Sequence, residues 1–378
     1  RQTSSHTMSA LAAAAKDKDS SVVLDEVKEY YGEVLKRTQD LKTNACCTAA
    51  MPSPAMFKLL HNIHKDVNNK YYGCGFVAPG LLHDTSVLDL GCGAGRDCYI
   101  LAQLVGAKGR VVGVDMTANM LDTAKATVDW HKERFGYASA NTSFELGYIE
   151  RLNELPSLAA GSFDVVVSNC VVNLSPDKEA VFRGAHHLLK DGGEMYFSDV
   201  YCSRRMPKDL QADPVLWGEC LSGALYWNDF VHMAKRCGFA DPRLMECSPI
   251  TIQNAEVEEK LKGYDFFSAT YRMWKLPEDK LEPDCENYGQ AVIYLGTVPG
   301  EETAVKLDDH HVFRTGEVAL VCGNTYNMLK ETRYNTHFTF IGDWSRHFGI
   351  FDGCGESMPF SSGGAAGGGG ACAGGSCC

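Results

Sequence analysis

Short apolar runs alternate with helical patterns through the middle of the chain. Five runs predict buried strands, at residues 87–90, 110–114, 143–146, 163–168 and 194–199. Apolar residues recur at helical spacing between some of these runs, over residues 117–135 and 178–189. Strands that alternate with helices predict a doubly wound parallel sheet of the Rossmann-like α/β class.

The flanking segments have a different character. Apolar residues at helical spacing predict an amphipathic helix over residues 22–41, and two more helices are predicted from Pro214 through residue 225 and from Asn228. Strands of a smaller α+β domain are predicted at residues 243–247, 270–276 and 290–296. The chain is therefore divided into an N-terminal helix with cysteine loops (1–85), a sheet domain (86–240), a C-terminal α+β domain (241–355) and a Gly/Cys-rich tail (356–378).

The break after the first strand carries the most specific local motif. Asp89-x-Gly91-x-Gly93-x-Gly95 leads from the apolar run into a helical pattern, an order typical of a strand, a glycine turn and a helix N-terminus. Asp115 ends the next strand, where a carboxylate can accept hydrogen bonds from both ribose hydroxyls of a nucleotide. Spacing alone does not distinguish a dinucleotide from S-adenosylmethionine. The tight glycine interval resembles the first motif of class I methyltransferases, which bind S-adenosylmethionine.

Further cofactor contacts are expected where the strands end. Ligands of open parallel sheets bind at the carboxyl ends of the strands. On this basis the cofactor contacts are assigned to Met116, Ile149, Glu150 and Asn169, with Glu150 placed to meet an adenine amino group. Tyr72 is assigned an aromatic contact with the sulfonium, a cation–π interaction of about 1 kcal/mol.

Composition narrows the choice of partners and compartment. The net charge is −12 and the sequence has no Lys/Arg cluster, which argues against a nucleic-acid partner. No apolar run approaches the roughly 20 residues that a membrane span needs. The 16 cysteines of a chain of this size are expected to be thiols rather than a disulfide scaffold. We therefore expect a monomeric cytoplasmic protein without a membrane partner.

Four separated places put a thiol beside glycine, asparagine or aromatic residues. They are Cys46 with its neighbour Cys47, Cys74, Cys170 and Cys220. No CxxC pair and no histidine at zinc spacing accompanies them, so a tetrahedral zinc site is not expected. Widely separated thiols at loop and strand ends suit a soft, three-coordinate ion that is gathered from several elements.

The segments around these cysteines resemble the arsenite methyltransferase family. The resemblance rests on VKEYYGEVLKRTQDLKTNACC, YYGCG, VLDLGCGAGRD, NCVVNL and WGECLSGALYW, and it fades after about residue 294. It implies that methyl groups pass from S-adenosylmethionine to trivalent arsenic held by cysteine thiolates, giving methylated arsenicals in arsenic detoxification. It further implies that Cys74, Cys170 and Cys220 bind arsenite and its methylated products as substrates.

The resemblance also implies a redox role for a fourth cysteine. Cys46 matches this position and is expected to be catalytic, able to pair with Cys74 in a disulfide, although the adjacent Cys47 leaves the choice between the two open. An external thiol reductant, glutathione or thioredoxin, is expected as a partner.

Other interpretations remain open at this point. Thiols within helix or strand patterns or inside the glycine turn are expected to be structural: Cys92, Cys98, Cys202 and Cys237. Trp217 and Glu219 either shape the substrate pocket or belong to the core. A class I methyltransferase of another small molecule, such as a quinone or a thiol, would share the sheet domain. A non-enzymatic soft-metal-binding protein is disfavoured by the intact glycine motif with Asp115.

Overall fold

A computed structural model describes residues 24, 27, 28, 54–71, 75–213, 216, 217, 220–252 and 254–354. The strands of this part of the chain are β1 (Ser86–Leu90), β2 (Arg110–Asp115), β3 (Thr142–Leu146), β4 (Phe163–Asn169), β5 (Leu189–Cys202), β6 (Leu225–Tyr226), β7 (Arg243–Ile250), β8 (Phe266–Trp274), β9 (Ala291–Tyr294), β10 (Ala304–Lys306), β11 (Val312–Arg314), β12 (Val318–Leu320) and β13 (Phe338–Ile341). The helices are α3 (Pro54–His61), α4 (Lys65–Asn69), α5 (Arg96–Val105), α6 (Ala118–Ala126), α7 (Val128–Phe135), α8 (Lys178–Leu188), α9 (Lys208–Gln211), α11 (Trp227–Arg236), α12 (Ala255–Lys260) and α13 (Gly323–Lys330), with 3-10 turns η3 (Ile149–Glu154), η4 (Val172–Leu174) and η5 (Asn335–His337).

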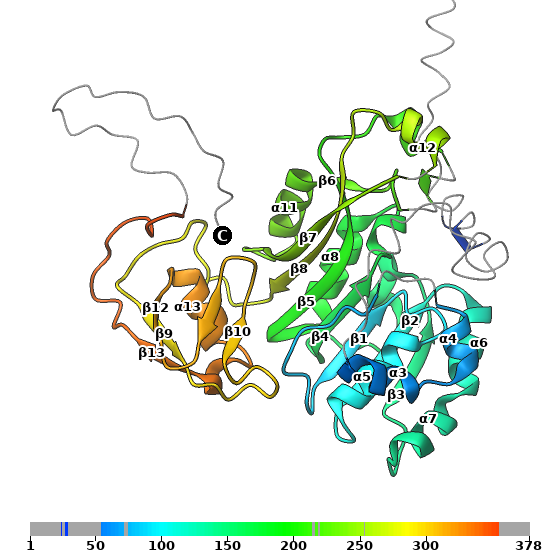
Figure 1. The fold of residues 1–378 in the computed structure, drawn as a ribbon, viewed down its shortest axis with the longest axis horizontal. Helices are drawn as coiled ribbons and strands as arrows, with labels where there is room; N and C mark the ends of the chain where they lie inside the picture. Colours follow the sequence, from blue (N-terminus) through cyan, green and yellow to red (C-terminus); the bar gives the residue numbers. More distant parts are fainter. Residues whose placement is uncertain are drawn as a thin grey trace, which may run out of the picture.

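Eight strands form one mixed sheet that is the frame of the molecule (Figure 1). Its order is β3-β2-β1-β4-β5-β8-β7, and β6 pairs with β5. The first five strands of this order are parallel to one another, whereas β8 runs antiparallel to both of its neighbours, β5 and β7. The central strands β1 and β4 are apolar and almost wholly buried, as parallel strands covered by helices on both faces must be. The predicted doubly wound sheet is confirmed.

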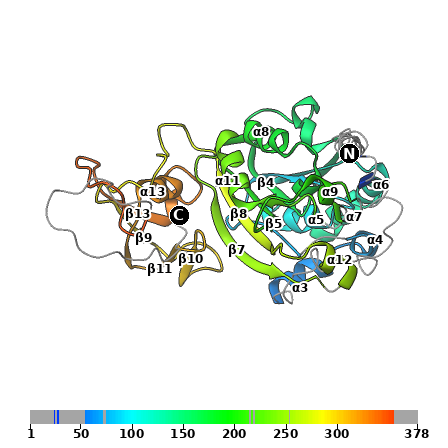
Figure 2. The ribbon, with the colours of Figure 1, turned by 90° about the horizontal axis from the view of Figure 1, so that it is seen from above.

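Helices cover both faces of this sheet. On one face α5 buries Tyr99 and Ile100 against β1, and on the other α8 and α11 bring Phe182 and Phe230 against β4 and β5. Figure 2 shows α8 on one side of the sheet and α3 on the opposite side. None of the helices within the described ranges is long and apolar enough to cross a lipid bilayer.

Two predicted elements differ in extent from the observed ones. The helix predicted over residues 117–135 is two helices, α6 and α7, because Thr127 interrupts it and its hydroxyl bonds to the carbonyl oxygen of Ala124 at 3.0 Å. Strand β5 begins five residues earlier than predicted, at Leu189, because the glycine pair 192–193 continues the strand instead of ending it in a turn.

The predicted helix from Pro214 through residue 225 is wrong in its second half. Of the described residues there, Leu216 and Trp217 are helical, Cys220 lies in a turn, and Leu225 begins β6. The cause is close packing, since a Cβ at Gly223 would lie 2.2 Å from the carbonyl oxygen of Asn173. The backbone of this segment is therefore pressed against the turn that follows β4.

The boundary predicted at residue 240/241 is also wrong. β7 and β8 do not belong to a separate domain, because β8 pairs with β5 along nine residue pairs and β7 pairs with β8. These antiparallel strands cover the edge that β5 would otherwise expose. The smaller C-terminal lobe therefore begins after Trp274, and the prediction of β9 within it is confirmed.

The C-terminal lobe is built on an antiparallel sheet of order β12-β9-β13, with the β10–β11 pair and α13 packed around it. Figure 1 shows this yellow and orange lobe at one side of the sheet domain. It contacts the amino end of β5, where Gly192 and Gly193 exchange backbone hydrogen bonds with Lys275 at 2.8 and 2.9 Å. Because ligands of parallel sheets bind at the opposite, carboxyl edge, the lobe lies away from the predicted site.

Buried charges join the lobe to β7. Arg243 is only 1% exposed and donates to both oxygens of Asp241, at 2.9 and 2.8 Å, and to Asp308 of the lobe at 3.1 Å. Asp308 also bonds to the ring of His311. Although burial alone would raise it, the contacts with His311 and Arg243 lower the pKa of Asp308 to about 2. A carboxylate at this position therefore stabilises the docked lobe.

We expect Asp308→Asn to lower the free energy of unfolding at pH 7 by about 2 kcal/mol, the value of a pKa shift from 3.8 to about 2. The stabilisation is present above pH 3.8 and is lost as pH falls through 2, because the unfolded state binds the proton first. Urea unfolding at pH 7 measures the difference. The control Asp309→Asn, on a half-exposed neighbour, should change stability by no more than about 0.5 kcal/mol. Equal effects of both variants would contradict the role of Asp308.

Candidate active site

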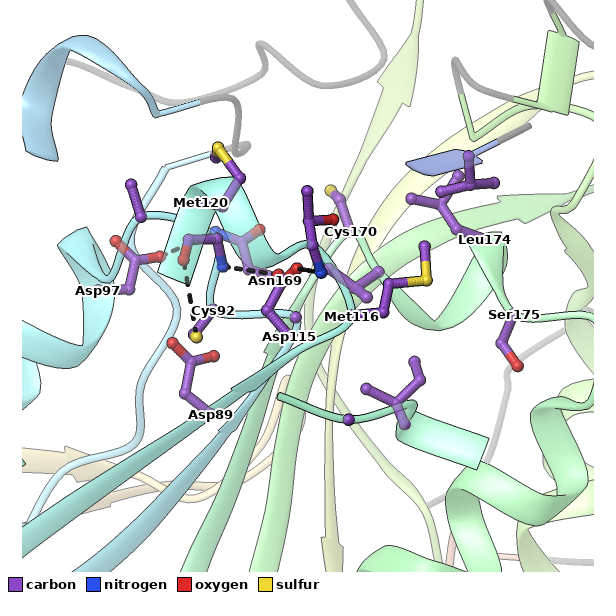
Figure 3. A pocket seen from close by; sticks show the side chains of 18 of the residues that line it. Asp89, Cys92, Asp97, Asp115, Met116, Met120, Asn169, Cys170, Leu174 and Ser175 are labelled. Atoms are coloured by element: carbon purple, nitrogen blue, oxygen red, sulfur yellow. Dashed lines mark hydrogen bonds between the residues drawn. The ribbon is translucent and has the colours of Figure 1, made fainter. Parts of the chain in front are cut away.

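A cavity that opens to solvent lies at the carboxyl edge of β1, β2 and β4. Figure 3 shows Asp89 and Asp97 at one end, Leu174 and Ser175 at the other, and Cys170 between them. The cavity therefore has an acidic end, an opposite end at Leu174 and Ser175, and Cys170 between the two.

The glycine turn forms the floor of the cavity. Gly91 and Gly93 have φ values of +72° and +54°, and the amides of Gly91 and Cys92 donate to the carbonyl oxygen of Val114. A Cβ at Gly91 would lie 2.4 Å from Val171, so no larger residue fits there. These contacts hold the turn at the edge of β1.

Gly95 has a packing role. A Cβ there would lie 2.8 Å from the ring of Phe144 and 3.1 Å from Ala124. Gly95 therefore allows α5 to pack closely on α6 and β3. Its assignment as a cofactor-binding residue stays a prediction.

Asp115 braces the glycine turn as well as lining the cavity. One carboxylate oxygen accepts from the amide of Gly93 and the other from the amide of Thr117, both at 2.8 Å. Each oxygen keeps a second lone pair for a ligand hydroxyl. Asp115 is thus positioned for the predicted ribose contact and also fixes the turn beside it.

Three carboxylates crowd the acidic end: Asp89, Asp97 and Asp115. Burial raises the pKa of Asp89 to about 7, and the charges of Asp97 and Asp115 add to the effect. Burial also raises the pKa of Asp97 and of Asp115. The thiol of Cys98 donates to Asp89 at 3.2 Å and partly compensates. An environment that disfavours three negative charges favours a cationic ligand.

Two predicted cofactor residues carry buried oxygen atoms with no partner among the described residues. Both carboxylate oxygens of Glu150 and the side-chain oxygen of Asn169 are in this state, and both residues line the cavity. Buried acceptors normally have donors. Met116 and Ile149, which line the same wall, supply apolar surface for a flat ring. The residues present therefore fit S-adenosylmethionine, whose adenine amino group and amino-acid end carry the missing donors.

Sequence reasoning missed several residues of the cavity wall: Leu24, Val27, Lys70, Tyr71, Arg96 and Asp97. Arg96 stacks on the ring of Tyr71, 3.1 Å from its centroid, and pairs with Asp97 at 3.1 Å. Asp97 in turn accepts from Asn169 at 3.3 Å. The position of Arg96 and Asp97 directly after the glycine motif was an available signal, whereas nothing local marked Leu24 and Val27.

Cys170 and Cys220 meet beside the cavity although fifty residues separate them. Both are buried, and the thiol of Cys220 donates to the carbonyl oxygen of Cys170 at 3.4 Å. Both have a left-handed backbone, with φ values of +56° and +60°. For residues that carry a Cβ this conformation is costly, and it persists only where the surroundings impose it, often at functional sites.

Cys170 is disulfide-bonded in this structure, whereas Cys220 and the other described cysteines are not in disulfides. A disulfide at Cys170 was not among the sequence predictions. Its sulfur must be reduced before it can act as a thiolate ligand.

A buried ammonium group accompanies the two cysteines. Lys178 donates to the carbonyl oxygen of Ser175 at 2.8 Å and lies 5.1 Å from the ring of Trp217. Burial lowers the pKa of Lys178 to about 8, partly offset by the charges of Asp199 and Cys220. Trp217 donates to the carbonyl oxygen of Leu174 at 3.3 Å. Trp217 therefore supports the cavity wall without lining it.

The remaining predicted site residues fall outside the described part of the chain. They are Cys46, Cys47, Tyr72, Cys74 and Glu219. Among the described residues, no three His, Cys, Asp or Glu side chains gather as a metal site. Of the three cysteines predicted to bind arsenic, the described residues thus include two, Cys170 and Cys220. The thiols predicted to be structural are buried, as expected: Cys92, Cys98, Cys202 and Cys237.

Comparison with known proteins identifies the family. Residues 81–238 match a methyltransferase domain, and residues 287–357 match the arsenite methyltransferase C-terminal domain. The chain is 59% identical to arsenite methyltransferase of Aquipseudomonas alcaligenes over 89% of this chain and 96% of that protein. It is 42% identical to the human arsenite methyltransferase over 93% and 88% of the two chains.

This chain belongs to the arsenite methyltransferase family. A crystal structure of an arsenic(III) S-adenosylmethionine methyltransferase from Chlamydomonas reinhardtii is also similar. It has a TM-score of 0.77 and 46% identity, and the match covers 80% of this chain and all of that one. The resemblance inferred from the cysteine segments is confirmed, and so is the class I methyltransferase fold of this arsenite methyltransferase family member. The prediction that the resemblance fades after about residue 294 is wrong, because the C-terminal domain model matches residues 287–357.

We expect the affinity for S-adenosylmethionine to fall by about five- to tenfold between pH 8 and pH 6. Asp89, with a pKa of about 7, takes up a proton over this range and loses the charge that attracts a cationic ligand. Calorimetry at several pH values measures the affinity. Asp89→Asn should bind weakly at both pH values, without the change, whereas Asp122→Asn on the surface of α6 should behave as wild type. An unchanged pH dependence in Asp89→Asn would assign the effect to another group.

The left-handed backbone at Cys220 gives a second prediction. Cys220→Gly should be more stable than Cys220→Ala by roughly 1 kcal/mol, because only glycine adopts φ +60° without strain. Urea unfolding compares the two variants. The control is Cys202, also buried but in the extended strand β5, where Ala should be more stable than Gly. If Ala were more stable than Gly at Cys220 as well as at Cys202, the backbone at Cys220 would not be strained.

Proposed function

We propose that the chain methylates trivalent arsenic, with Cys74, Cys170 and Cys220 as its thiolate ligands. The observation that carries the proposal is the meeting of Cys170 and Cys220, both left-handed, beside a cavity with an acidic, cation-favouring end. Soft thiolates are suitable ligands for a soft, three-coordinate centre. Cys74 comes from the family resemblance and directly precedes Gly75, whose carbonyl oxygen accepts from Asn169 at 2.5 Å.

The chain's own residues hold and orient the two reactants. Asp115 takes the ribose hydroxyls, Glu150 the adenine amino group, and the glycine turn with Asn169 the amino-acid end of the cofactor. When bound, S-adenosylmethionine supplies a methyl group activated by a sulfonium. Arsenic bound by three thiolates is pyramidal and keeps a lone pair, so no general base is needed. The protein's contribution is to align the arsenic lone pair with the methyl group. A misplacement near 1 Å costs about a hundredfold in rate.

The redox chemistry requires a source of electrons. A disulfide at Cys170 becomes two thiols when two equivalents of an external thiol, such as glutathione or thioredoxin, are oxidised to a disulfide. We assign Cys46 to this exchange, with Cys47 as the alternative, and its pairing with Cys74 stays a prediction. Nine of the ten described cysteines are not in disulfides, which supports a reducing, cytoplasmic setting. We also propose that the protein is a monomer and that its substrates are arsenite and methylated arsenicals.

Cys170→Ser and Cys220→Ser should each abolish methylation of both arsenite and monomethylarsenite, because each change removes a ligand of the arsenic. Cofactor affinity should persist, since Cys220 is not among the residues that line the cavity and Cys170 lies apart from Asp89 and Asp97. The measurement is speciation of arsenic after incubation with a thiol and methyl-labelled S-adenosylmethionine, beside calorimetry of cofactor binding. Cys237→Ser, on a buried thiol at the end of α11, is the matched control.

Near-normal turnover in either variant would return that cysteine to a structural role. Methylation of a quinone or an organic thiol without methylation of arsenite would favour the other small-molecule methyltransferase. Absence of S-adenosylmethionine binding would favour a non-enzymatic metal-binding protein.

A further inference from the structure

One short segment connects the C-terminal lobe to the cavity. Residues 75–82 precede β1, with Gly75 in contact with the cavity wall and Gly80 and Leu81 in contact with the lobe. The lobe lies at the amino end of β5, so it does not reach the cavity through the sheet edge where the ligand binds. Residues 75–82 therefore connect the lobe to the cavity wall.

The cavity end of the segment is fixed by hydrogen bonds. The carbonyl oxygen of Gly75 accepts from Asn169 at 2.5 Å and from the hydroxyl of Tyr71, and the amide of Gly75 donates to Tyr71 at 3.2 Å. Asn169 and Tyr71 both line the cavity. The position of Gly75 therefore determines how two residues of the wall are oriented.

The middle of the segment leaves little freedom between its ends. Phe76 and Ala78 pack against the core beneath α5, and Pro79 is buried. The ring of Pro79 restricts its backbone to a narrow range of φ. A displacement of Gly80 is consequently transmitted along the four intervening residues rather than absorbed by them.

The lobe end is held by Arg333 and by a strained residue. Arg333 donates to the carbonyl oxygen of Gly80 from two nitrogens, at 3.2 and 2.9 Å, and pairs with Glu194 of β5. Leu81 has a left-handed φ of +58° and packs its side chain on the core of the lobe. A leucine in this conformation indicates that the lobe imposes it.

Glu194 balances the charge of Arg333 at the lobe end of the segment. Glu194 is fully buried and pairs with both Arg272 and Arg333. Although burial alone would raise it, the two arginines hold the pKa of Glu194 below its usual range. The guanidinium of Arg333 thus pairs with Glu194 of the sheet and at the same time donates to Gly80 of the segment.

We propose that Arg333 is a positioning residue for the methyl-transfer site, acting from the C-terminal lobe through Gly80 and residues 75–82. The lobe would then set the geometry of Gly75, Tyr71 and Asn169 without contacting a ligand. This inference rests on the proposed function, because it assigns a role in that same site. It gives the arsenite methyltransferase C-terminal domain a part in cofactor and substrate placement.

The test compares Arg333→Lys with Lys306→Met. Lysine keeps a positive charge beside Glu194 but has a single nitrogen, so it cannot bond Gly80 from two nitrogens as Arg333 does. Lys306 is the matched control, because it also donates from the lobe to a backbone oxygen, Met245 of β7 at 2.6 Å, away from the segment. Arg333→Lys should weaken S-adenosylmethionine binding about fivefold and raise the KM for arsenite at least as much, with faster hydrogen exchange in residues 75–82. Lys306→Met should change none of these.

A second pair of variants tests the same route independently of the charge. Leu81→Gly removes the apolar anchor while keeping the left-handed backbone, and Asp84→Gly changes another left-handed residue, φ +59°, in the exposed turn before β1. Leu81→Gly should reproduce the effects of Arg333→Lys, and the double variant should be little worse than either single one. Asp84→Gly should behave as wild type.

Unchanged cofactor affinity and KM in both Arg333→Lys and Leu81→Gly would overturn the inference. Loss of thermal stability alone, without a change in cofactor affinity, would reduce Arg333 to a structural role and would overturn it as well. Cofactor affinity is measured without arsenic, so failure of the wild type to methylate arsenite would refute the proposed function and leave this comparison valid.

Discussion

The site depends on the parallel pairing of β1, β4 and β5. This pairing sets Leu90 beside Ser168, and Asn169 beside Ser198, so the three strands end at one edge. The hydrogen-bond ladder continues past β4, where the amide of Cys170 donates to Ser198 at 2.8 Å. The glycine turn and the predicted arsenic-binding thiol are consequently brought together by backbone hydrogen bonding, before any side chain makes a specific contact.

The cavity contains two different environments, one acidic and one apolar. Its acidic end holds carboxylates whose ionisation is disfavoured by burial and mutual repulsion, a state that a cationic ligand relieves. Away from this end, Cys170 and Cys220 pack with apolar Leu174 and Val27, an environment in which a neutral ligand would cost little desolvation. Under the proposed function, the cationic cofactor would occupy the acidic end and the arsenic would lie beside the cysteines.

The sequence predicted what local pattern controls. Strands β1 to β4 were recognisable from their apolar runs, and the glycine turn, Asp115 and Glu150 from their spacing. The membership of β7 and β8 in the main sheet was not recognisable, because it depends on pairing with β5 rather than on any property of residues 243–250 or 266–274. The left-handed backbone of Cys170 and Cys220 was equally hidden, since it arises where two distant segments press together.

β5 connects the two functional halves of the molecule through its two ends. At its amino end Glu194 binds arginines from β8 and the C-terminal lobe, and at its carboxyl end Asp199 accepts from the amide of Asn173 at 2.9 Å. From Glu194 to Ser198, β5 is paired on both edges, with β4 and with β8. This pairing gives the C-terminal lobe a second backbone connection to the turn after β4, in addition to residues 75–82 before β1. Both connections include a contact of Arg333, with Glu194 in one and with Gly80 in the other.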